Sequence, residues 1–492
     1  MDGGSAANAG RSSRPGGHDP LAALGALLAC PACGDAAGLA RRTDHFACGA
    51  CKARFPVYKS GAAQVPWLFR DPEAARLEWR ARFNGFLHAN AVECSRLEAA
   101  LRDRRLSKRA AERIRRVLDA RVAQKRQVLE LLAPLSLGAP RAGPLSDRSG
   151  ALHAALPRQQ GLTSYYSNVF RDWSWGNGEN EALLQCVERV ASRVPQFKAG
   201  KLLTLGAGAG RLSYDVHRAY RPELSVALDL NPLLVLLASR VVCGEKLAFH
   251  ELPIAPLDQA SFAVARSLSC PEPLSAGDNF VLVLGDALHA PFRPASFDTV
   301  LTPWLVDIVP QSFAECAAAV SRLLAPGGIW VNTGSLAFFH RNEAWCHSEE
   351  EALELVAAHG FEILASERVT VPYLQSPASA HGRVERVLSF SARKIASCPR
   401  SAETPYLPPW LLESERPIPD LDELVVASAT HLLKATVLAA IDGRRSIDDI
   451  ASLIAKRYGL QKSEAKGAVE RILIEIHDAA ALVSRDRLPE LE

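Results

Sequence analysis

The sequence predicts an α/β protein whose central domain is a parallel sheet covered by helices. A small cysteine-containing segment precedes this domain and a mainly helical segment follows it. Three patterns predict this fold class. Between Asn180 and Lys394, apolar runs such as "KLLTLG", "LSVALD", "NFVLVL", "FDTVLT" and "GGIWVN" alternate with helix-compatible stretches, as they do in parallel sheets. Two pairs of closely spaced cysteines lie upstream, and helical periodicity dominates residues 401–492.

Length and composition are typical of a globular protein with several domains. The chain has 492 residues, 48% of them hydrophobic and 23% charged, and this length favours about three domains. No apolar run reaches the roughly 18 residues that a membrane span needs. Residues 1–20 lack the apolar stretch of an export signal, so we expect a disordered leader and a cytoplasmic protein. The net charge of +3 gives no general attraction to nucleic acid.

Four of the eleven cysteines form two CxxC pairs, Cys30 with Cys33 and Cys48 with Cys51. Two such pairs present four thiolates, the tetrahedral ligand set of a structural zinc ion. Two disulfides or four unrelated thiols are the alternatives, although disulfides are rare in a reducing compartment. The other cysteines are scattered singly through apolar runs, as small core residues are. Residues 21–70 are therefore predicted to be a zinc ribbon.

The ribbon segment also resembles a known family. From "LLACPACG" through "RFPV" to "QVPWLF" it is similar to the small zinc-ribbon family of the methyltransferase activator subunit. In that family the ribbon supports a partner methyltransferase, so the resemblance implies a scaffold and not a catalyst.

Residues 71–137 are predicted to be a basic helical connector. Leu101, Ile114, Leu118 and Val122 are spaced along one helical face, and arginines dominate the other. The basic face predicts either a solvated connector that packs on the central domain or a groove for nucleic acid. The lack of stacking aromatics among the central arginines weakens the RNA interpretation. Residues 138–160 are rich in proline and glycine and are predicted to be a linker.

A glycine loop and two carboxylates mark the predicted cofactor site. Gly206, Gly208 and Gly210 follow the first strand, where glycines let the backbone approach a ligand closely. Asp229 ends the second strand about twenty residues later, where a carboxylate accepts hydrogen bonds from both ribose hydroxyls. Asp286 ends the third strand, in a position to accept a hydrogen bond from an adenine amine. An NAD site would share the first two features.

The later strands distinguish the two cofactors. The runs "GDALHAPFRPASFDTVLTPWLVD" and "LLAPGGIWV" resemble the S-adenosylmethionine-dependent methyltransferase fold. The resemblance implies a Rossmann-like core over residues 161–396 with S-adenosylmethionine as cofactor. Arg211, which follows the glycine loop, and Ala287, which follows Asp286, complete the candidate cofactor residues.

The run "NVFRDWSWGNGENE", together with "GAGAGRLSYDV" and "LLAPGGIWVNTG", resembles the carnosine N-methyltransferase family. That family has an Arg-Asp-Trp-Ser motif just before the core fold, which helps to cover the cofactor. By analogy, Arg171 meets the methionine carboxylate, and Trp173 and Trp175 close the cofactor site. Aromatic walls suit a cationic sulfonium, and a cover excludes water. The alternative is a segment whose tryptophan anchors it to the sheet.

The resemblance also implies the acceptor site. Asp307, past the end of the fourth strand, matches the acid that binds the imidazole of the family's substrate and fixes its tautomer. His340 and Tyr373 lie near positions that the family uses for the same ring. The family's histidine aligns with Phe339, one place before His340, and "ALDLNP" departs from the family's second strand. The dipeptide substrate therefore does not follow.

Residues 401–492 are predicted to form a mainly helical, winged-helix-like domain. Ser446 and Ser463 are predicted helix N-caps, with a turn at Asp442-Gly443, so three short helices are expected. The segment resembles the peptide-recognition domain of pyrroloquinoline quinone biosynthesis, which implies a leader-peptide partner. A generic winged-helix DNA reader would give a similar pattern.

These patterns together predict a methyltransferase that acts on an imidazole or similar nitrogen of a small molecule or peptide. Two alternatives remain open. The ribbon and the basic helix together predict an RNA methyltransferase, whose RNA affinity would fall steeply with salt. A catalytically inactive peptide-binding adaptor is the other alternative, against which the intact glycine loop, Asp229 and Asp286 argue.

Overall fold

The computed structural model describes residues 20–137, 161–338, 343–398, 410 and 415–480. The chain forms two compact units. The first contains residues 1–83 and 126–406, and the second contains residues 84–125 and 407–492. Within the described residues, no helix is both long enough and apolar enough to cross a membrane.

The core of the first unit is a seven-stranded sheet in the order β12-β13-β11-β10-β5-β6-β9. Its strands are β5 (Lys201–Leu205), β6 (Leu224–Asp229), β9 (Phe280–Leu284), β10 (Phe297–Pro303), β11 (Leu324–Gly334), β12 (Phe361–Tyr373) and β13 (Arg383–Lys394). Parallel pairing joins β11, β10, β5, β6 and β9 in this order, and β13 runs antiparallel to both of its neighbours. The parallel strands and the helices between them confirm the predicted α/β core. β12 and β13 extend the sheet beyond the strands that the sequence predicts.

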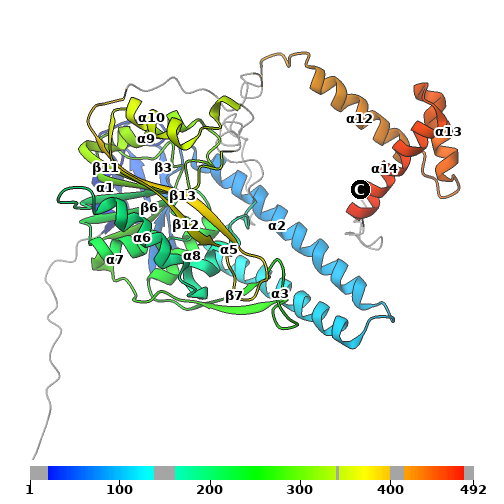
Figure 1. Ribbon diagram of the computed structural model, residues 1–492, viewed down its shortest axis with the longest axis horizontal. Helices are drawn as coiled ribbons and strands as arrows, with labels where there is room; N and C mark the ends of the chain where they lie inside the picture. Colours follow the sequence, from blue (N-terminus) through cyan, green and yellow to red (C-terminus); the bar gives the residue numbers. More distant parts are fainter. Residues whose placement is uncertain (1–19, 138–160, 339–342, 399–409, 411–414, 481–492) are drawn as a thin grey trace, which may run out of the picture. The chain divides into compact units, whose positions relative to one another are not determined.

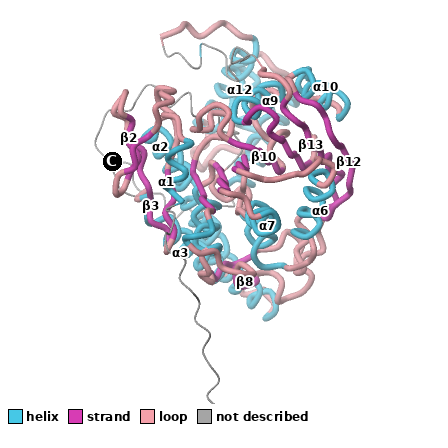
Figure 2. The backbone as a smooth tube through the Cα atoms, turned by 90° about the vertical axis from the view of Figure 1, so that its left-hand side faces the viewer, coloured by secondary structure: helices cyan, strands magenta, loops and turns pink. Residues whose placement is uncertain are grey.

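Helices cover both faces of this sheet (Figures 1 and 2). Buried side chains of α6 (Glu179–Ala191) and α7 (Arg211–Tyr220) pack with Leu202 on one face. Those of α9 (Phe313–Leu323) and α10 (Glu349–Ala358) pack with Leu203 on the other. Because successive side chains of a strand point to opposite faces, a strand buried on both sides is apolar throughout. This explains the continuous apolar runs.

The N-terminal segment folds into a small antiparallel sheet in the order β1-β2-β3-β4. Its elements are α1 (Pro20–Leu27), β1 (Leu39–Arg41), β2 (His45–Cys48), β3 (Arg54–Ser60) and β4 (Ala63–Pro66). The chain then continues alongside the edge strand β9, where the Leu68 amide donates to the Leu284 carbonyl at 2.7 Å. Phe46 and Phe55 of this segment are buried in the same apolar cluster as one face of the central sheet. The segment is therefore part of the first unit.

The remaining elements of the first unit are short, apart from α8. They are η1 (Ala133–Leu135), α5 (Tyr166–Phe170), a π-helical turn η2 (Arg171–Trp175), α8 (Pro232–Val242), the strand pair β7 (Leu247–Glu251) and β8 (Val264–Leu268), η3 (Ala276–Asp278) and η4 (Glu343–Trp345).

The basic stretch forms two long helices, α2 (Pro72–Leu101) and α3 (Lys108–Leu132). The C-terminal part of α2 and the N-terminal part of α3 belong to the second unit. They run antiparallel, and the Asn90 side chain donates to the Arg121 carbonyl at 3.1 Å. Exposed arginines and Lys108 surround the turn that joins the helices.

The C-terminal part contains α12 (Asp422–Ala439), α13 (Ile447–Tyr458) and α14 (Lys462–Ala480), so the three predicted helices are present. Ser446 caps α13 in a capping box with Asp449, and Asp442 accepts from two backbone amides in the predicted turn. Ser463 is not an N-cap, because α14 already begins at Lys462. The described part of this segment, 415–480, contains no strand. A wing is a strand pair, so the described residues show the predicted helices without a wing, and the winged-helix-like form stays a prediction.

Candidate active site and metal centre

The glycine loop between β5 and α7 needs its glycines for two different reasons. The backbone φ angles of Gly206, Gly208 and Gly210 are +71°, +58° and +84°, a conformation that other residues rarely adopt. A Cβ atom on Gly206 would lie 2.8 Å from Leu305, and one on Gly210 would lie 3.2 Å from Ala238. A Cβ on Gly208 would meet nothing within 4 Å. Gly206 and Gly210 therefore permit packing, whereas Gly208 leaves its backbone open to a cavity.

Asp229 ends β6 beside this loop. Its Oδ2 accepts the Gly208 amide and its Oδ1 accepts the Asn231 amide, both at 2.8 Å. Burial raises the pKa of Asp229 to about 6, although these backbone hydrogen bonds oppose the rise. Each carboxylate oxygen has two lone pairs, so each can accept one further hydrogen bond. This geometry suits a ligand that offers two hydroxyl groups.

Asp286 follows β9 and lies at the same cavity with Ala287. Its carboxylate accepts the Leu288 amide at 3.0 Å and lies 2.7 Å from Nδ1 of His289. Burial opposes ionisation of Asp286, but the charge and hydrogen bonds of His289 hold its pKa below the usual value. The carboxylate is therefore ionised and keeps accepting capacity for a ligand.

The cavity brings together most of the predicted cofactor residues. Its lining includes the predicted Arg171, Gly206, Gly208, Asp229, Asp286, Ala287 and Tyr373. It also includes residues that the sequence analysis missed, among them Asn168, Asn231, Trp304 and Gln311. Four predicted site residues that the structure describes do not line the cavity, namely Trp173, Gly210, Arg211 and Asp307.

Trp173 and Trp175 contact the protein interior. Trp173 is 2% exposed, and its indole nitrogen donates to the Ala209 carbonyl of the glycine loop at 2.8 Å. The guanidinium of Arg211 lies 5.5 Å from the Trp173 ring and donates to the Asp172 carbonyl. The indole nitrogen of Trp175 donates to Glu251. These contacts match the anchoring interpretation of the segment, and a covering function of the two tryptophans stays a prediction.

Arg171, in the same segment, has its guanidinium at the cavity. It forms a buried ion pair with Asp172 at 2.7 Å, and its guanidinium carbon lies 5.8 Å from the centre of the Tyr373 ring. Arg171 thus lines the cavity close to Tyr373.

Asp307 lies past the end of β10, as predicted, and is 8% exposed. Its Oδ2 accepts the Ser335 hydroxyl at 2.8 Å and the Ala337 amide at 3.2 Å. Its Oδ1 is buried without a hydrogen-bond partner among the described residues, and burial raises the pKa of Asp307. Its neighbours Leu305 and Ile308 line the cavity. The predicted His340, and Phe339 before it, lie outside the described residues.

Tyr373 and Trp304 form an aromatic wall of the cavity. Tyr373 ends β12 and Trp304 follows β10, and their ring centres are 5.7 Å apart. Trp304 has a φ of +44°, an unusual backbone conformation for a bulky residue that often marks functional sites. Its indole nitrogen donates to Glu385 at 3.2 Å. The position of Trp304 directly after a strand was the available signal in the sequence.

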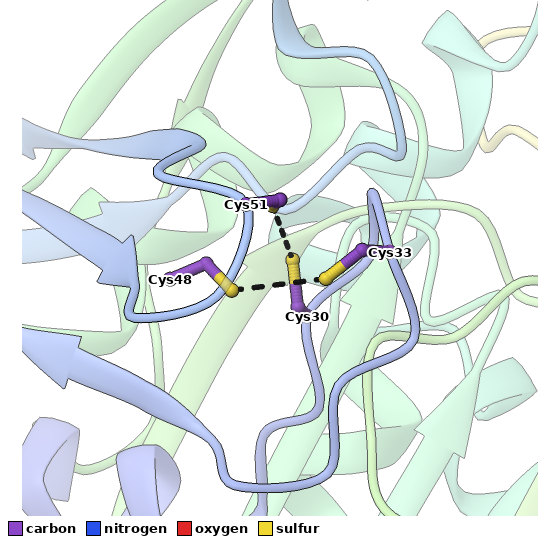
Figure 3. A group of neighbouring side chains, drawn as sticks. All are labelled: Cys30, Cys33, Cys48 and Cys51. Carbon is purple, nitrogen blue, oxygen red and sulfur yellow. Dashed lines mark hydrogen bonds between the residues drawn. The ribbon is translucent and has the colours of Figure 1, made fainter.

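The four predicted zinc ligands lie together, with their sulfur atoms facing one another (Figure 3). All four sulfurs are within 4.8 Å of one another. The Sγ atoms of Cys30 and Cys51 are 3.6 Å apart, and those of Cys33 and Cys48 are 3.8 Å apart. Tetrahedral zinc with Zn–S bonds of about 2.3 Å requires sulfur separations of about 3.8 Å. All four cysteines are free thiols, so the geometry fits zinc and does not show disulfides.

The backbone of the second cysteine pair favours a thiolate. The pKa of the Cys48 thiol is lowered to about 7. The largest cause is the hydrogen bond that the Cys51 backbone amide donates to the Cys48 sulfur. Amide donors around a sulfur stabilise its negative charge in the same way when a metal is bound.

Comparison with known proteins gives a consistent family. The family profile of carnosine N-methyltransferase matches residues 151–396. A Drosophila melanogaster carnosine N-methyltransferase is 26% identical over 46% of this chain and 53% of its own length. The Mus musculus enzyme is 25% identical over 41% of this chain and 54% of its own length. The chain thus spans about half the length of these curated relatives.

Solved methyltransferase structures resemble part of the chain only distantly. A putative methyltransferase from Bacillus halodurans has a TM-score of 0.30 and 14% identity over 44% of this chain and the whole of that one. A phosphoethanolamine N-methyltransferase from Haemonchus contortus has a TM-score of 0.29 and 17% identity over 47% of this chain and 48% of that one. Neither likeness bears on the activity. The family profile, by contrast, covers half of the 492 residues and the whole central sheet, so the chain belongs to the carnosine N-methyltransferase family.

Proposed function

We propose that this chain is an S-adenosylmethionine-dependent methyltransferase that methylates an imidazole or similar nitrogen of a small molecule or peptide. The observation that carries the proposal is one cavity that joins the open backbone of Gly208, the buried carboxylates Asp229 and Asp286, and the aromatic wall of Trp304 and Tyr373. Family membership supports the reaction class. The activity of the whole protein is a proposal, because only about half of each fly or mouse relative is matched.

The cofactor residues fit S-adenosylmethionine by their chemistry. Asp229 has spare lone pairs for ribose hydroxyls, and Asp286 has them for an adenine amine. The guanidinium of Arg171 suits the methionine carboxylate, although Asp172 already pairs with it. The bound cofactor supplies an electrophilic methyl group on a sulfonium. Isothermal titration calorimetry of the wild-type chain with S-adenosylmethionine tests this fit directly, and lack of binding would exclude it.

Asp307 is the residue that we assign to the acceptor. Its Oδ1 is buried and has no partner among the described residues, and the residue lies beside Leu305 and Ile308 of the cavity lining. In the proposed complex this oxygen reaches the cavity and accepts the N–H of an imidazole, which keeps the proton on one ring nitrogen. The opposite nitrogen then has its lone pair free to form the new N–C bond as the C–S bond breaks. The negative charge of Asp307 stabilises the imidazolium as it forms. Trp304 and Tyr373 restrict the ring to one plane and exclude water.

The pKa of Asp229 predicts how cofactor affinity depends on pH. A carboxylate with a pKa of about 6 is mostly protonated at pH 5 and loses acceptor capacity for ribose hydroxyls. We expect S-adenosylmethionine to bind roughly tenfold more weakly at about pH 5 than at about pH 7.5, because one proton must be released on binding. Calorimetry across this range measures the dependence. The Asp229→Asn variant should bind weakly at every pH, and an equal pH dependence in that variant would contradict the assignment.

We also propose that the cysteine cluster holds a structural zinc ion and that the ribbon supports the cofactor cavity. The ribbon holds the loop that contains Asp286 at both ends. Leu68 bonds to Leu284 before this loop. After it, the Ala29 amide donates to the Pro291 carbonyl at 3.0 Å. Ala29 directly precedes Cys30, so metal binding would order this contact.

Metal removal tests the zinc proposal. The wild-type protein should contain one zinc per chain, and chelation should lower its thermal unfolding temperature by roughly 10 °C, since structural zinc contributes several kcal/mol to folding. The Cys33→Ser variant should reproduce this loss, whereas Cys346→Ser, at an exposed cysteine outside the cluster, should not. Elemental analysis and calorimetric unfolding give both readouts. A metal-free protein of unchanged stability would refute the proposal.

The other predicted partners stay predictions. Exposed basic residues around the α2–α3 turn are compatible with RNA, and steeply salt-dependent binding would be its signature. The helices α12 and α13 line a groove that includes Ala435, Leu453 and Arg457. The leader peptide that the resemblance implies for this domain stays a prediction. The adaptor alternative would be supported by peptide binding without S-adenosylmethionine binding.

A further inference from the structure

Helix α6 begins with two buried polar side chains that bind different parts of the first unit. Asn180 is 6% exposed, and its amide nitrogen donates to the Arg171 carbonyl at 2.9 Å. Glu179 is 1% exposed, and its carboxylate accepts the Leu374 amide at 2.9 Å and the Gln375 amide at 2.7 Å. The first turn of α6 thus joins the Arg171 segment to the end of β12.

The Glu179 contacts satisfy backbone groups that the sheet does not. The pairing of β12 with β13 ends at Tyr373, so the next two amides have no strand partner. Leu374 has a φ of +50°, which turns the chain sharply at this point. Asn177 adds a further contact, because its amide nitrogen donates both to Glu179 and to the Gln375 carbonyl at 2.8 Å. A buried carboxylate with several acceptor sites meets this demand, since an unpaired buried amide is costly.

The residue just before these amides is Tyr373, which lines the cavity. Its ring lies 5.7 Å from Trp304 and 5.8 Å from the guanidinium of Arg171. The direction of the Tyr373 side chain depends on the backbone that follows it, and Glu179 fixes that backbone at two consecutive amides.

We propose that Glu179 is a positioning residue for the acceptor side of the cavity. Its carboxylate holds the Leu374 and Gln375 backbone and so sets the Tyr373 ring against Trp304. Asn180, the next residue, holds the Arg171 backbone from the same helical turn. The inference rests on the proposed function in one respect, namely that Tyr373 contacts the methyl acceptor.

The Glu179→Gln variant tests the proposal. A glutamine keeps one carbonyl acceptor and has an NH₂ group in place of the second carboxylate oxygen, so that this NH₂ group faces a backbone donor. We expect the KM for carnosine, used as the acceptor probe, to rise about tenfold, the effect of losing one hydrogen bond to a charged group. The Kd for S-adenosylmethionine should change less than about twofold, because the Trp173 contact to the glycine loop remains. Glu181→Gln, at an exposed residue of the same turn, is the matched control.

Hydrogen exchange gives a readout that needs no acceptor. Amides in the peptide containing Leu374 and Gln375 should exchange faster in Glu179→Gln than in the wild type and in Glu181→Gln. If Glu179→Gln does not fold, Asn177→Ala should give the same changes at smaller size, because it removes one of the contacts to Gln375. Unchanged exchange, or cofactor affinity that falls in parallel with acceptor affinity, would overturn the proposal. A wild-type protein that transfers no methyl group would instead refute the proposed function and leave the exchange test valid.

Discussion

Gly208→Val should abolish S-adenosylmethionine binding. Gly208 faces the open cavity, and a Cβ there meets no protein atom within 4 Å, so valine would fill the space that the cofactor needs. Overpacking costs up to about 3 kcal/mol in protein interiors, which corresponds to a loss of affinity of roughly a hundredfold. Calorimetry measures the change.

The control separates ligand space from backbone strain. Gly327 also has a positive φ, +77°, and a Cβ there also meets nothing within 4 Å, but it lies at an exposed position between α9 and the buried part of β11. Gly327→Val therefore imposes similar strain without entering the cavity. It should bind S-adenosylmethionine like the wild type at a reduced unfolding temperature. Cofactor binding by Gly208→Val at wild-type affinity would show that the cofactor does not occupy this cavity.

Asp307→Asn and Asp307→Ala should bind S-adenosylmethionine normally and lose methyl transfer. Asp307 is not among the described cavity-lining residues, and its contacts are to Ser335 and Ala337. The loss of the carboxylate removes control of the acceptor's tautomer and stabilisation of the imidazolium. Acid–base and electrostatic contributions of this kind are each worth about 10²–10⁴ in rate, so we expect kcat to fall at least about a hundredfold.

The readout for Asp307 combines calorimetry with transfer of a labelled methyl group. Glu354→Gln, which removes an exposed carboxylate on α10, is the control and should retain full activity. Full activity of Asp307→Ala would refute the imidazole mechanism. Loss of cofactor binding in the same variant would show that Asp307 supports the fold of the cavity and not the acceptor.

The cofactor side of the cavity was predictable because its signals are local in the sequence. The loop that contains Gly208 directly follows one strand, and Asp229 ends the next one, so parallel topology alone brings them together. Ser446 and Asp442 were predictable for the same reason, since caps and turns depend on neighbouring residues. Ser463 shows the usual error of one or two residues at a helix start.

The acceptor side was harder to predict because its contacts join distant residues. Glu179 binds the amides of Leu374 and Gln375, which are 195 and 196 residues away in the sequence. No local sequence pattern indicates a contact between residues this far apart. Trp304 is recognisable as a site residue only from the fold, because the other half of the aromatic wall, Tyr373, comes from the distant strand β12. The interpretation of Trp173 as a lid or an anchor likewise depended on the Ala209 carbonyl.

The ribbon, too, was predictable in its local features and not in its long-range contacts. The CxxC spacing predicted that four thiols meet, and their sulfurs do. The spacing contained no information on where the ribbon binds. The bonds from Leu68 to Leu284 and from Ala29 to Pro291 place it against the loop of Asp286.

The measurement that tests the central claim most directly is the transfer of a labelled methyl group from S-adenosylmethionine to carnosine and to histidine-containing peptides. Mass spectrometry of the product then locates the methyl group. Our account predicts methylation of a ring nitrogen by the wild-type chain and almost none by Asp307→Asn. Cofactor binding without transfer to any imidazole, or transfer that Asp307→Asn carries out equally well, would contradict it.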